Sequence, residues 1–198
     1  MSRLEAGAGR AMVATMIAGI RIARRRIGFP EIPLDFSLGP VRCGLALSGS
    51  GLRFAADFGP GARTVPAARP GGFFEGLWEA DVAEFFFAPT GATGDGAYLE
   101  INLAPNGAWW ASWFSAPRVR DLGCPLPTVR SSGDGQRAEA WIDPRDLRAL
   151  VLSSPRSTGN LTAISGGQFF SHAPLGGRQP DFHRPADFLP LITPPDEA

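Results

Sequence analysis

Two glutamates, two tryptophans and one asparagine in the middle of the chain are the residues whose types and spacing could do chemistry: Trp78, Glu84, Glu100, Asn102 and Trp110. Two carboxyl groups on one face could act as the acid and base of a glycoside hydrolase, or could hydrogen-bond the hydroxyls of a bound sugar. An indole ring can stack on the apolar face of a sugar. These residue types are therefore consistent with hydrolysis and with a ligand-binding surface.

Glu84 lies in a segment that is largely apolar on both faces of the predicted strand, which is typical of a strand inside a sheet. Burying an unpaired carboxylate is costly, so Glu84 needs a partner. One interpretation is an ion pair with one of the many arginines, and the other is contact with a ligand. Arg118 and Arg120 follow the second glutamate and could neutralise these carboxylates. We place Arg118 in the candidate site.

Other chemistries lack their usual sequence signals. The chain has no Gly-x-Ser-x-Gly motif and no phosphate-binding loop, and neither cysteine has a motif neighbour. The two histidines, His172 and His183, could join Glu84 or Glu100 in a two-histidine, one-carboxylate metal site, but no tight spacing supports it. We expect His183 instead to hold the turn at 181–185 through hydrogen bonds. We predict no catalytic residue, no metal and no cofactor.

Strands must position the candidate residues. From 97 to 103 the odd positions are apolar and the even positions are polar or amphipathic, a period of two that indicates a strand with one buried face. Pro105, Asn106 and Gly107 then favour a three-residue hairpin loop with a bulge at the glycine. A two-residue turn on Asn106-Gly107 is the alternative, and it would leave Pro105 inside the ladder.

The three-residue loop fixes which residues face each other across the hairpin. The predicted pairs are Leu103 with Trp109, Asn102 with Trp110, Glu100 with Ser112, Leu99 with Trp113, and Tyr98 with Phe114. Trp109 and Trp113 then pack in the core, whereas Trp110 lies on the open face, where we expect it to be exposed. The two-residue turn would move Trp110 to the core face.

The same residues resemble a known family. The order Leu77-Trp78, Glu84, Tyr98, Glu100, Asn102, Pro105 and Trp110 is similar to that of DOMON-like proteins related to family 9 carbohydrate-binding modules. A second segment is similar too: Phe170, His172, Pro180-Asp181-Phe182-His183 and Phe188. The resemblance implies a non-catalytic module that binds a saccharide or another small polar ligand on one sheet face, which leaves hydrolysis by the paired carboxylates as a minor alternative. It adds Phe170, His172 and His183 to the ligand-binding candidates.

The sequence departs from the family pattern at two points that affect which ligand, haem or sugar, the domain is expected to bind. DOMON-type sandwiches that carry haem use a methionine with a histidine, but methionine occurs here only at positions 1, 12 and 16, ahead of the domain. We therefore expect no haem. Sugar-binding members have a second tryptophan near the C-terminus, whereas the last one here is Trp141, so Phe170 or Phe182 would have to replace it.

The remaining segments predict short strands and turns. Residues 41–59 predict a hairpin, 60–72 a long surface connection, 78–88 a central strand, 131–135 a turn, 136–143, 160–165 and 168–173 strands, and 143–150 a short helical turn. This pattern predicts an all-β, antiparallel β-sandwich, immunoglobulin-like or jelly-roll-like, with about nine to eleven strands from residue 40 onward. We predict a poorly structured N-terminal extension at 1–35, which could include a short helix, and one domain at 36–198.

The composition limits which classes of binding partner are expected. The chain has 198 residues, enough for one domain, and a formal net charge of zero gives no reason to expect nucleic acid. Cys43 and Cys124 have no metal or redox spacing, so two unrelated buried thiols are the first interpretation and a disulfide is the second. The expected partner is a small-molecule or saccharide ligand. The alternative is a protein-interaction or scaffolding sandwich that has lost ligand binding.

The apolar run from Ala11 to Ile20 is too short to span a bilayer, and its arginines follow it instead of preceding it as in a secretory signal. We therefore expect a cytoplasmic location without stable membrane insertion. A short amphipathic helix that touches a membrane is the alternative.

Overall fold

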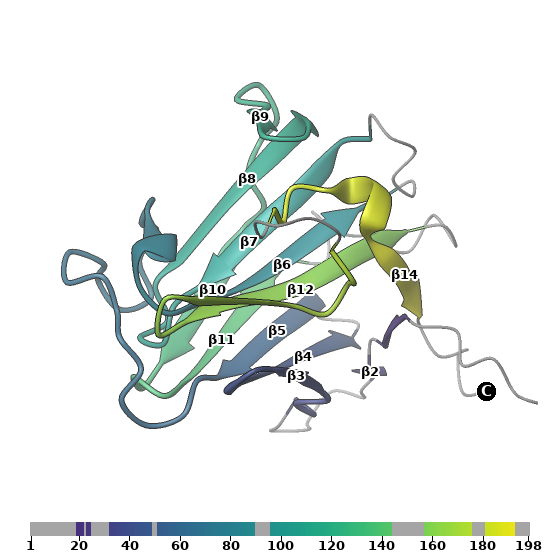
Figure 1. The fold of residues 1–198 in the computed structure, drawn as a ribbon. Coiled ribbons are helices and arrows are strands. Elements are labelled where there is room, and N and C mark those ends of the chain that lie inside the picture. Colours follow the sequence, from purple (N-terminus) through teal and green to yellow (C-terminus); the bar gives the residue numbers. More distant parts are fainter. Residues whose placement is uncertain are drawn as a thin grey trace, which may run out of the picture.

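The computed structural model describes residues 19–21, 23–24, 32–48, 51–89, 96–143, 157–175 and 181–192. They form two β-sheets that pack face to face, as Figure 1 shows. Nearly all strand pairs are antiparallel, and the described part contains eleven strands after residue 40. The predicted antiparallel β-sandwich is therefore confirmed.

The larger sheet has the strand order β1-β14-β12-β6-β7-β8-β9, and β13 also pairs with β12. Its strands are β1 (Ile20–Arg21), β6 (Val82–Ala88), β7 (Tyr98–Leu103), β8 (Trp109–Ala116), β9 (Val119–Arg120), β12 (Thr158–Ser165), β13 (Gln168–Ser171) and β14 (Leu189–Ile192). β6 lies between β12 and β7, which confirms its predicted central position.

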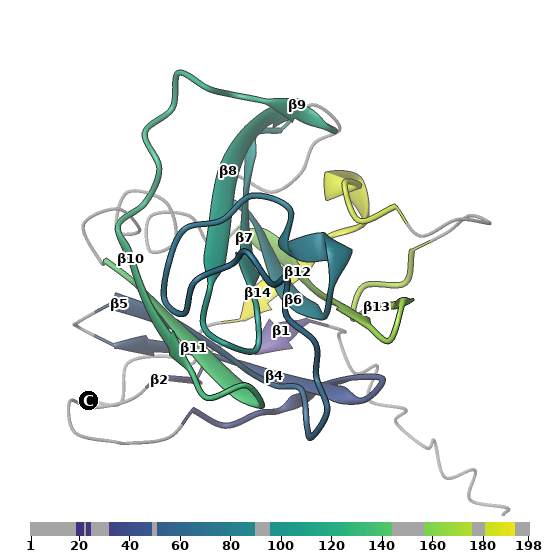
Figure 2. The ribbon, with the colours of Figure 1, turned by 90° about the vertical axis from the view of Figure 1, so that its left-hand side faces the viewer.

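The smaller sheet has the order β10-β11-β5-β4-β2, and β3 pairs with β4. Its strands are β2 (Ala23–Arg24), β3 (Phe36–Leu38), β4 (Val41–Ser48), β5 (Gly51–Asp57), β10 (Val129–Gly133) and β11 (Arg137–Ile142). β4 and β5 form the hairpin predicted for 41–59. Figure 2 shows this sheet beneath the strands of the larger one.

The main core lies between the two sheets. Odd-numbered residues of β6 and β7, such as Phe85 and Ile101, point into it and meet Phe54 and Leu45 of the smaller sheet. The even-numbered residues of the same strands therefore lie on the outer face of the larger sheet. The period-two pattern in the sequence corresponds to these two faces.

A second apolar cluster covers part of that outer face. Phe86 and Tyr98 of the larger sheet pack there against Leu77 and Phe188. Leu77 belongs to a short 3-10 helix, η1 (Leu77–Glu79), and a second one, η2 (Pro185–Asp187), directly precedes Phe188. Segments before β6 and before β14 therefore border the outer face, and they form the walls of the candidate site.

The hairpin of β7 and β8 has the predicted register, with Asn102 opposite Trp110. The Ala104 N–H donates to the Ala108 carbonyl and the Gly107 N–H to the Ala104 carbonyl, both at 2.8 Å. Gly107 has φ 80°, in the left-handed region that favours glycine. The three-residue loop is confirmed, and the two-residue alternative is excluded.

Two predicted boundaries are wrong. Trp78 does not begin a strand, because Gly76 takes a left-handed conformation (φ 98°) and starts η1 instead. The Asp81 carboxylate then accepts hydrogen bonds from the backbone N–H groups of Arg63 (2.7 Å) and Gly166 (2.8 Å), which fixes the entry to β6. The turn predicted at 131–135 is shorter, because β10 continues through Gly133 in its ladder with β11.

Part of the predicted N-terminal extension belongs to the sandwich. β1 pairs with β14, β2 pairs with β4, and Ile20 is buried in the main core. Cys43 and Cys124 are both free thiols, as predicted, but only Cys43 is buried and Cys124 is partly exposed. The helical turn predicted at 143–150 lies outside the described residues after Asp143. Within the described segments, no helix has the length and apolarity needed to cross a membrane.

Candidate functional site

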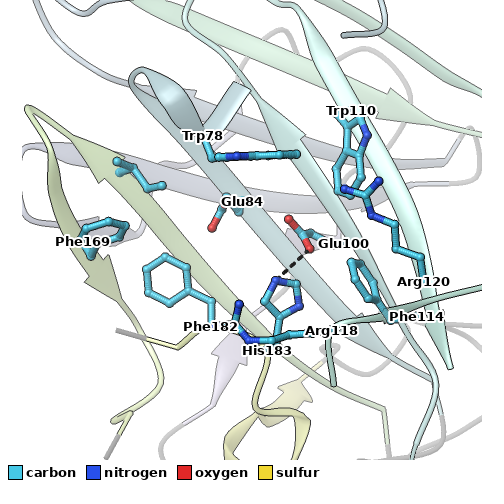
Figure 3. A pocket seen from close by; sticks show the side chains of 11 residues that line it. Trp78, Glu84, Glu100, Trp110, Phe114, Arg118, Arg120, Phe169, Phe182 and His183 are labelled. Atoms are coloured by element: carbon cyan, nitrogen blue, oxygen red, sulfur yellow. Dashed lines mark ion pairs between the residues drawn. The ribbon is translucent and has the colours of Figure 1, made fainter. Parts of the chain in front are cut away.

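A cavity of about 390 Å³ opens on the outer face of the larger sheet. Figure 3 shows it as a ring of side chains around two glutamates. The lining residues are Trp78, Glu84, Glu100, Trp110, Phe114, Arg118, Arg120, Ile164, Phe169, Phe182 and His183. Six of the nine residues that the sequence assigned to ligand binding are among them: Trp78, Glu84, Glu100, Trp110, Arg118 and His183.

The strand register brings the two glutamates together. Glu84 on β6 lies opposite Asn102 on β7, and Phe86 lies opposite Glu100. Glu84 and Glu100 are thus diagonal neighbours on adjacent strands and point to the same face. In Figure 3 both carboxyl groups lie at the centre of the cavity.

Glu84 is buried on the floor of the cavity, with 4% of its surface exposed. The hydroxyl of Thr162, directly across the ladder on β12, donates a 2.5 Å hydrogen bond to Glu84 Oε2. Burial raises the pKa of Glu84 to about 7, and the bond from Thr162 opposes that change. Among the described residues no arginine forms an ion pair with Glu84, so the structural ion-pair interpretation lacks a partner there.

Glu100 is equally buried. Burial, and then the negative charge of Glu84, hold its pKa well above the usual range, against the smaller opposing effects of the Asn102 amide and of Arg120 and Arg118. Its Oε2 atom makes no hydrogen bond within the described part of the chain. This oxygen lies 3.8 Å from His183 Nε2.

His183 reaches the cavity from the segment before η2. Its Nδ1 atom lies 2.7 Å from the hydroxyl of Tyr98, and its ring contacts Phe86 and Phe114. Burial, and then the positive charge of Arg118, lower the pKa of His183 to about 4. The ring is therefore neutral near pH 7, and its contact with Glu100 is not an ion pair at that pH.

The turn predicted around His183 is held by its backbone instead of its ring. The His183 N–H donates to Asp181 Oδ1 at 3.1 Å, while the imidazole points into the cavity. The expected structural role of the side chain is therefore incomplete, because the ring also lines the site.

Two arginines stand at the rim, and each has its own carboxylate partner. Arg118 Nη2 lies 2.8 Å from Asp181 Oδ1, and Arg120 Nη1 lies 2.6 Å from Glu75 Oε1. The guanidinium of Arg120 also covers the ring of Trp110, 4.8 Å from its centroid. Both cations are thus engaged at the rim, which leaves the glutamates on the floor for a ligand.

The aromatic residues differ in how far they are open to a ligand. Trp78 is 38% exposed and contacts Trp110 edge-on, with ring centroids 5.5 Å apart. Trp110 lies on the predicted face, but the expectation that it is exposed is wrong: only 3% of it is accessible, because Trp78 and Arg120 cover it. Trp113 is buried in the main core and Trp109 packs against it, as predicted.

Three predicted site residues lie outside the lining. Asn102 is fully buried beside Glu84 and Trp110. Phe170 packs against the main core, with its ring against Gly39, and the His172 ring contacts Phe36 edge-on at 4.9 Å. Phe170 and His172 therefore help to join the larger sheet to β3.

Several lining residues were missed in the sequence. Phe169 is 52% exposed, and its ring contacts Phe182, the residue considered as a substitute for the missing tryptophan. Alternation along β13 would have indicated that Phe169 and Phe170 face opposite ways. In Figure 3, Phe169 and Phe182 lie on the side of the cavity opposite Trp110 and Arg120. Phe114 and Ile164 also line the cavity, as does Arg120, which the sequence placed near the carboxylates without assigning it to the site.

The site is suited to hydrogen bonding more than to holding a metal. Within the segments that the structure describes, no three His, Cys, Asp or Glu side chains gather closely enough to coordinate an ion. The cavity offers carboxyl oxygens, one neutral imidazole and an accessible indole. These groups can accept and donate hydrogen bonds to hydroxyls while an apolar ring face is stacked.

No protein-family model matches the chain, and no curated protein matches it. Among solved structures, it is similar to a candidate carbohydrate-binding protein from Bacteroides uniformis, at 18% identity and a TM-score of 0.60 over 89% of this chain and 100% of that one. Two structures of a family 9 carbohydrate-binding module from Caldicellulosiruptor kristjanssonii, with cellotriose and with glucose, match at 13% identity and a TM-score of 0.49. They cover 90% of this chain, and 96% and 98% of theirs. The Bacteroides uniformis likeness shows the fold of the chain.

Proposed function

We propose that this protein is a non-catalytic saccharide-binding module and that the cavity over Glu84 and Glu100 is its binding site. The observation that carries the proposal is the pair of buried carboxyl groups facing one cavity beside an accessible tryptophan. Both rim arginines form ion pairs with other carboxylates, and among the described residues neither forms an ion pair with Glu84 or Glu100. Such an arrangement is stabilised by a ligand that brings hydrogen-bond donors.

The energetics favour a polyhydroxylated ligand. A buried polar atom without a partner costs about 1–3 kcal/mol, and Glu100 Oε2 is such an atom in the described structure. A sugar presents several hydroxyls on a small ring, and each can donate to a carboxyl oxygen. The cavity volume of about 390 Å³ lies within the range of small-molecule sites. It is suited to one sugar ring, free or at the end of a longer glycan.

Aromatic contacts would orient such a ring. Trp78 presents an accessible indole at one side of the cavity, and Phe182 and Phe169 line another side. A sugar ring has C–H groups on its faces, which pack well on aromatic surfaces, and hydroxyls at its edge. The Bacteroides uniformis protein of similar fold is described as a candidate carbohydrate-binding protein, which supports the same ligand class here.

Calorimetric titration with a panel of neutral monosaccharides and disaccharides tests the proposal. We expect at least one sugar to bind the wild-type protein, and Glu100→Gln to weaken it by about tenfold or more, because the amide replaces a carboxyl acceptor with a donor. Glu139→Gln is the matched control. Glu139 lies on β11 of the other sheet, where it pairs with Arg53, so its substitution should leave sugar affinity unchanged.

Two results would contradict the proposal. One is failure of every sugar in the panel to bind the folded protein, which would favour the scaffolding alternative. The other is equal loss of affinity in Glu100→Gln and Glu139→Gln, which would mean that the substitutions weaken binding by destabilising the fold and not by changing the cavity. Circular dichroism of each variant checks that the fold is retained.

A further inference from the structure

A chain of hydrogen bonds runs behind His183. The backbone N–H of Arg118 donates to the Tyr98 hydroxyl at 3.2 Å, and that hydroxyl lies 2.7 Å from His183 Nδ1. Tyr98 is fully buried, and its ring stacks on Phe114 with centroids 4.9 Å apart. The hydroxyl is thus held in place by packing as well as by its two polar neighbours.

The direction of this chain follows from the number of hydrogens. A tyrosine hydroxyl has one hydrogen to donate. The Arg118 N–H already supplies a hydrogen to the oxygen, and among the described residues the other group within hydrogen-bond distance of the hydroxyl is His183 Nδ1. Buried donors are almost always paired, so the Tyr98 hydrogen goes to Nδ1. Nδ1 is then an acceptor, and the neutral ring carries its hydrogen on Nε2.

That Nε2–H group faces Glu100. The Nε2 to Oε2 separation is 3.8 Å, which is longer than the 2.7–3.2 Å of an N–H···O hydrogen bond. One ligand oxygen placed between them could lie within hydrogen-bond distance of both atoms. Such an oxygen must accept from Nε2–H and donate to the carboxyl oxygen. A hydroxyl can do both.

We propose that Tyr98 is a positioning residue that fixes His183 as an Nε2–H donor, so that His183 and Glu100 together bind one hydroxyl group of the saccharide. The hydroxyl part rests on the proposed function, whereas the positioning of His183 can be tested without a ligand. An ammonium group is a donor only and cannot accept from Nε2–H. While Glu100 Oε2 carries no hydrogen, an ether or fluorine cannot donate to it, because these groups are acceptors only. The pair then selects a hydroxyl over these groups.

Long-range ¹H–¹⁵N NMR of the imidazole rings tests the positioning. The chain has only two histidines, so His172→Gln assigns both sets of signals. We expect His183 in the ligand-free wild type near pH 7 to show a protonated Nε2 and an unprotonated Nδ1. A protonated Nδ1 in that spectrum would overturn the inference, and this measurement needs no variant at position 98.

Tyr98→Phe then tests whether the Tyr98 hydroxyl determines which ring nitrogen of His183 is protonated. It removes the hydroxyl and keeps the ring that packs on Phe114. We expect the Nδ1-protonated form of His183 to appear in this variant, because Nδ1 has lost its donor. A merely structural role for Tyr98 would change the melting temperature and leave the His183 ring unchanged. An unchanged ring spectrum in a folded variant would overturn the positioning role.

The hydroxyl subsite is tested with monodeoxy and monofluoro sugars. For glucose and galactose, we expect removal of one particular hydroxyl to lower affinity by about tenfold or more, and replacement of it by fluorine not to restore the full affinity. In Tyr98→Phe the loss caused by that deoxy sugar should shrink. Equal affinity of every deoxy sugar and its parent would overturn the hydroxyl subsite.

The saccharide-binding function and the hydroxyl subsite can fail separately. If neither parent sugar nor any other sugar binds, the proposed function fails and the hydroxyl subsite fails with it, while the histidine spectra still decide whether Tyr98 positions His183. If a parent sugar binds and its deoxy series shows no loss, the proposed function stands and the subsite does not.

Discussion

Glu84 and Thr162 face each other across neighbouring antiparallel strands, and the threonine hydroxyl donates a 2.5 Å hydrogen bond to Glu84 Oε2. A hydrogen bond to a carboxylate favours the charged form, whereas burial disfavours it. Burial is the larger effect here, which places the pKa of Glu84 at about 7. The cavity floor thus holds a carboxyl group whose charge changes near neutral pH.

Thr162→Val should raise the pKa of Glu84 further. The substitution keeps the β-branched shape of the side chain and removes the donor to Oε2, so burial is opposed less. Carboxyl ¹³C NMR titration measures the change, with Glu84→Gln used to assign the signal. An unchanged or lower pKa would show that this hydrogen bond does not stabilise the charged form.

Glu84→Gln should change how stability depends on pH. Because the folded pKa of Glu84 (about 7) lies above its ordinary value of 4.5, the unfolded chain loses this proton first as pH rises. The contribution of Glu84 is fully present below pH 4.5 and is lost as pH rises through about 7, by roughly 3 kcal/mol at most. Urea unfolding should therefore show the variant gaining stability relative to wild type over that range. A constant difference would contradict the raised pKa.

His183→Gln should show the opposite trend. The folded pKa of His183 (about 4) lies below its ordinary value of 6.5, so the unfolded chain takes up a proton first as pH falls. Its contribution is fully present above pH 6.5 and is lost as pH falls through about 4. The stability difference between wild type and variant should therefore shrink on acidification. In the wild type the two effects oppose each other between pH 4.5 and 6.5, so only the variants separate them. A gap that widens towards acid pH would contradict the lowered pKa.

Gly107→Ala should destabilise the fold more than Gly135→Ala. Both glycines have positive φ, 80° and 96°, so alanine is strained at both, by about 1–2 kcal/mol. At Gly107 a Cβ atom would also lie 2.4 Å from the backbone carbon of Ser132, whereas at Gly135 nothing lies within 4 Å. Thermal unfolding of the two variants measures the difference. Equal losses would mean that the hairpin loop does not pack closely on β10.

Local patterns predicted the hairpin and its two faces. Alternation from 97 to 103 and the Pro105-Asn106-Gly107 loop depend on neighbouring residues, and they determine that Glu100, Asn102 and Trp110 share a face. That Glu84 lies on the same face depends on the pairing of β6 with β7. The exposure of Trp110 depends on what covers it. Its covers, Trp78 and Arg120, come from η1 and from β9, and no local pattern positions them over β8.

The C-terminal residues show a second limit of sequence reasoning. Both His172 and His183 are ligand-binding candidates by sequence, but the first packs on Phe36 and the second reaches Tyr98 and Glu100. This difference is set by the path of the chain after β13, which sequence periodicity does not encode. The choice of Phe170, where Phe169 lines the cavity, could have been avoided from the sequence. The period of two along a strand puts the two side chains on opposite faces.

The indole N–H spectrum of the wild-type protein, recorded during titration with the saccharide panel, tests the central claim most directly. The chain has five tryptophans, and Trp78→Phe identifies the indole N–H signal of Trp78. A saccharide that occupies the cavity should shift the Trp78 signal saturably and leave Trp141, on β11 of the other sheet, unchanged. A panel in which no saccharide shifts Trp78, or in which a sugar that binds shifts only Trp141, would contradict the account.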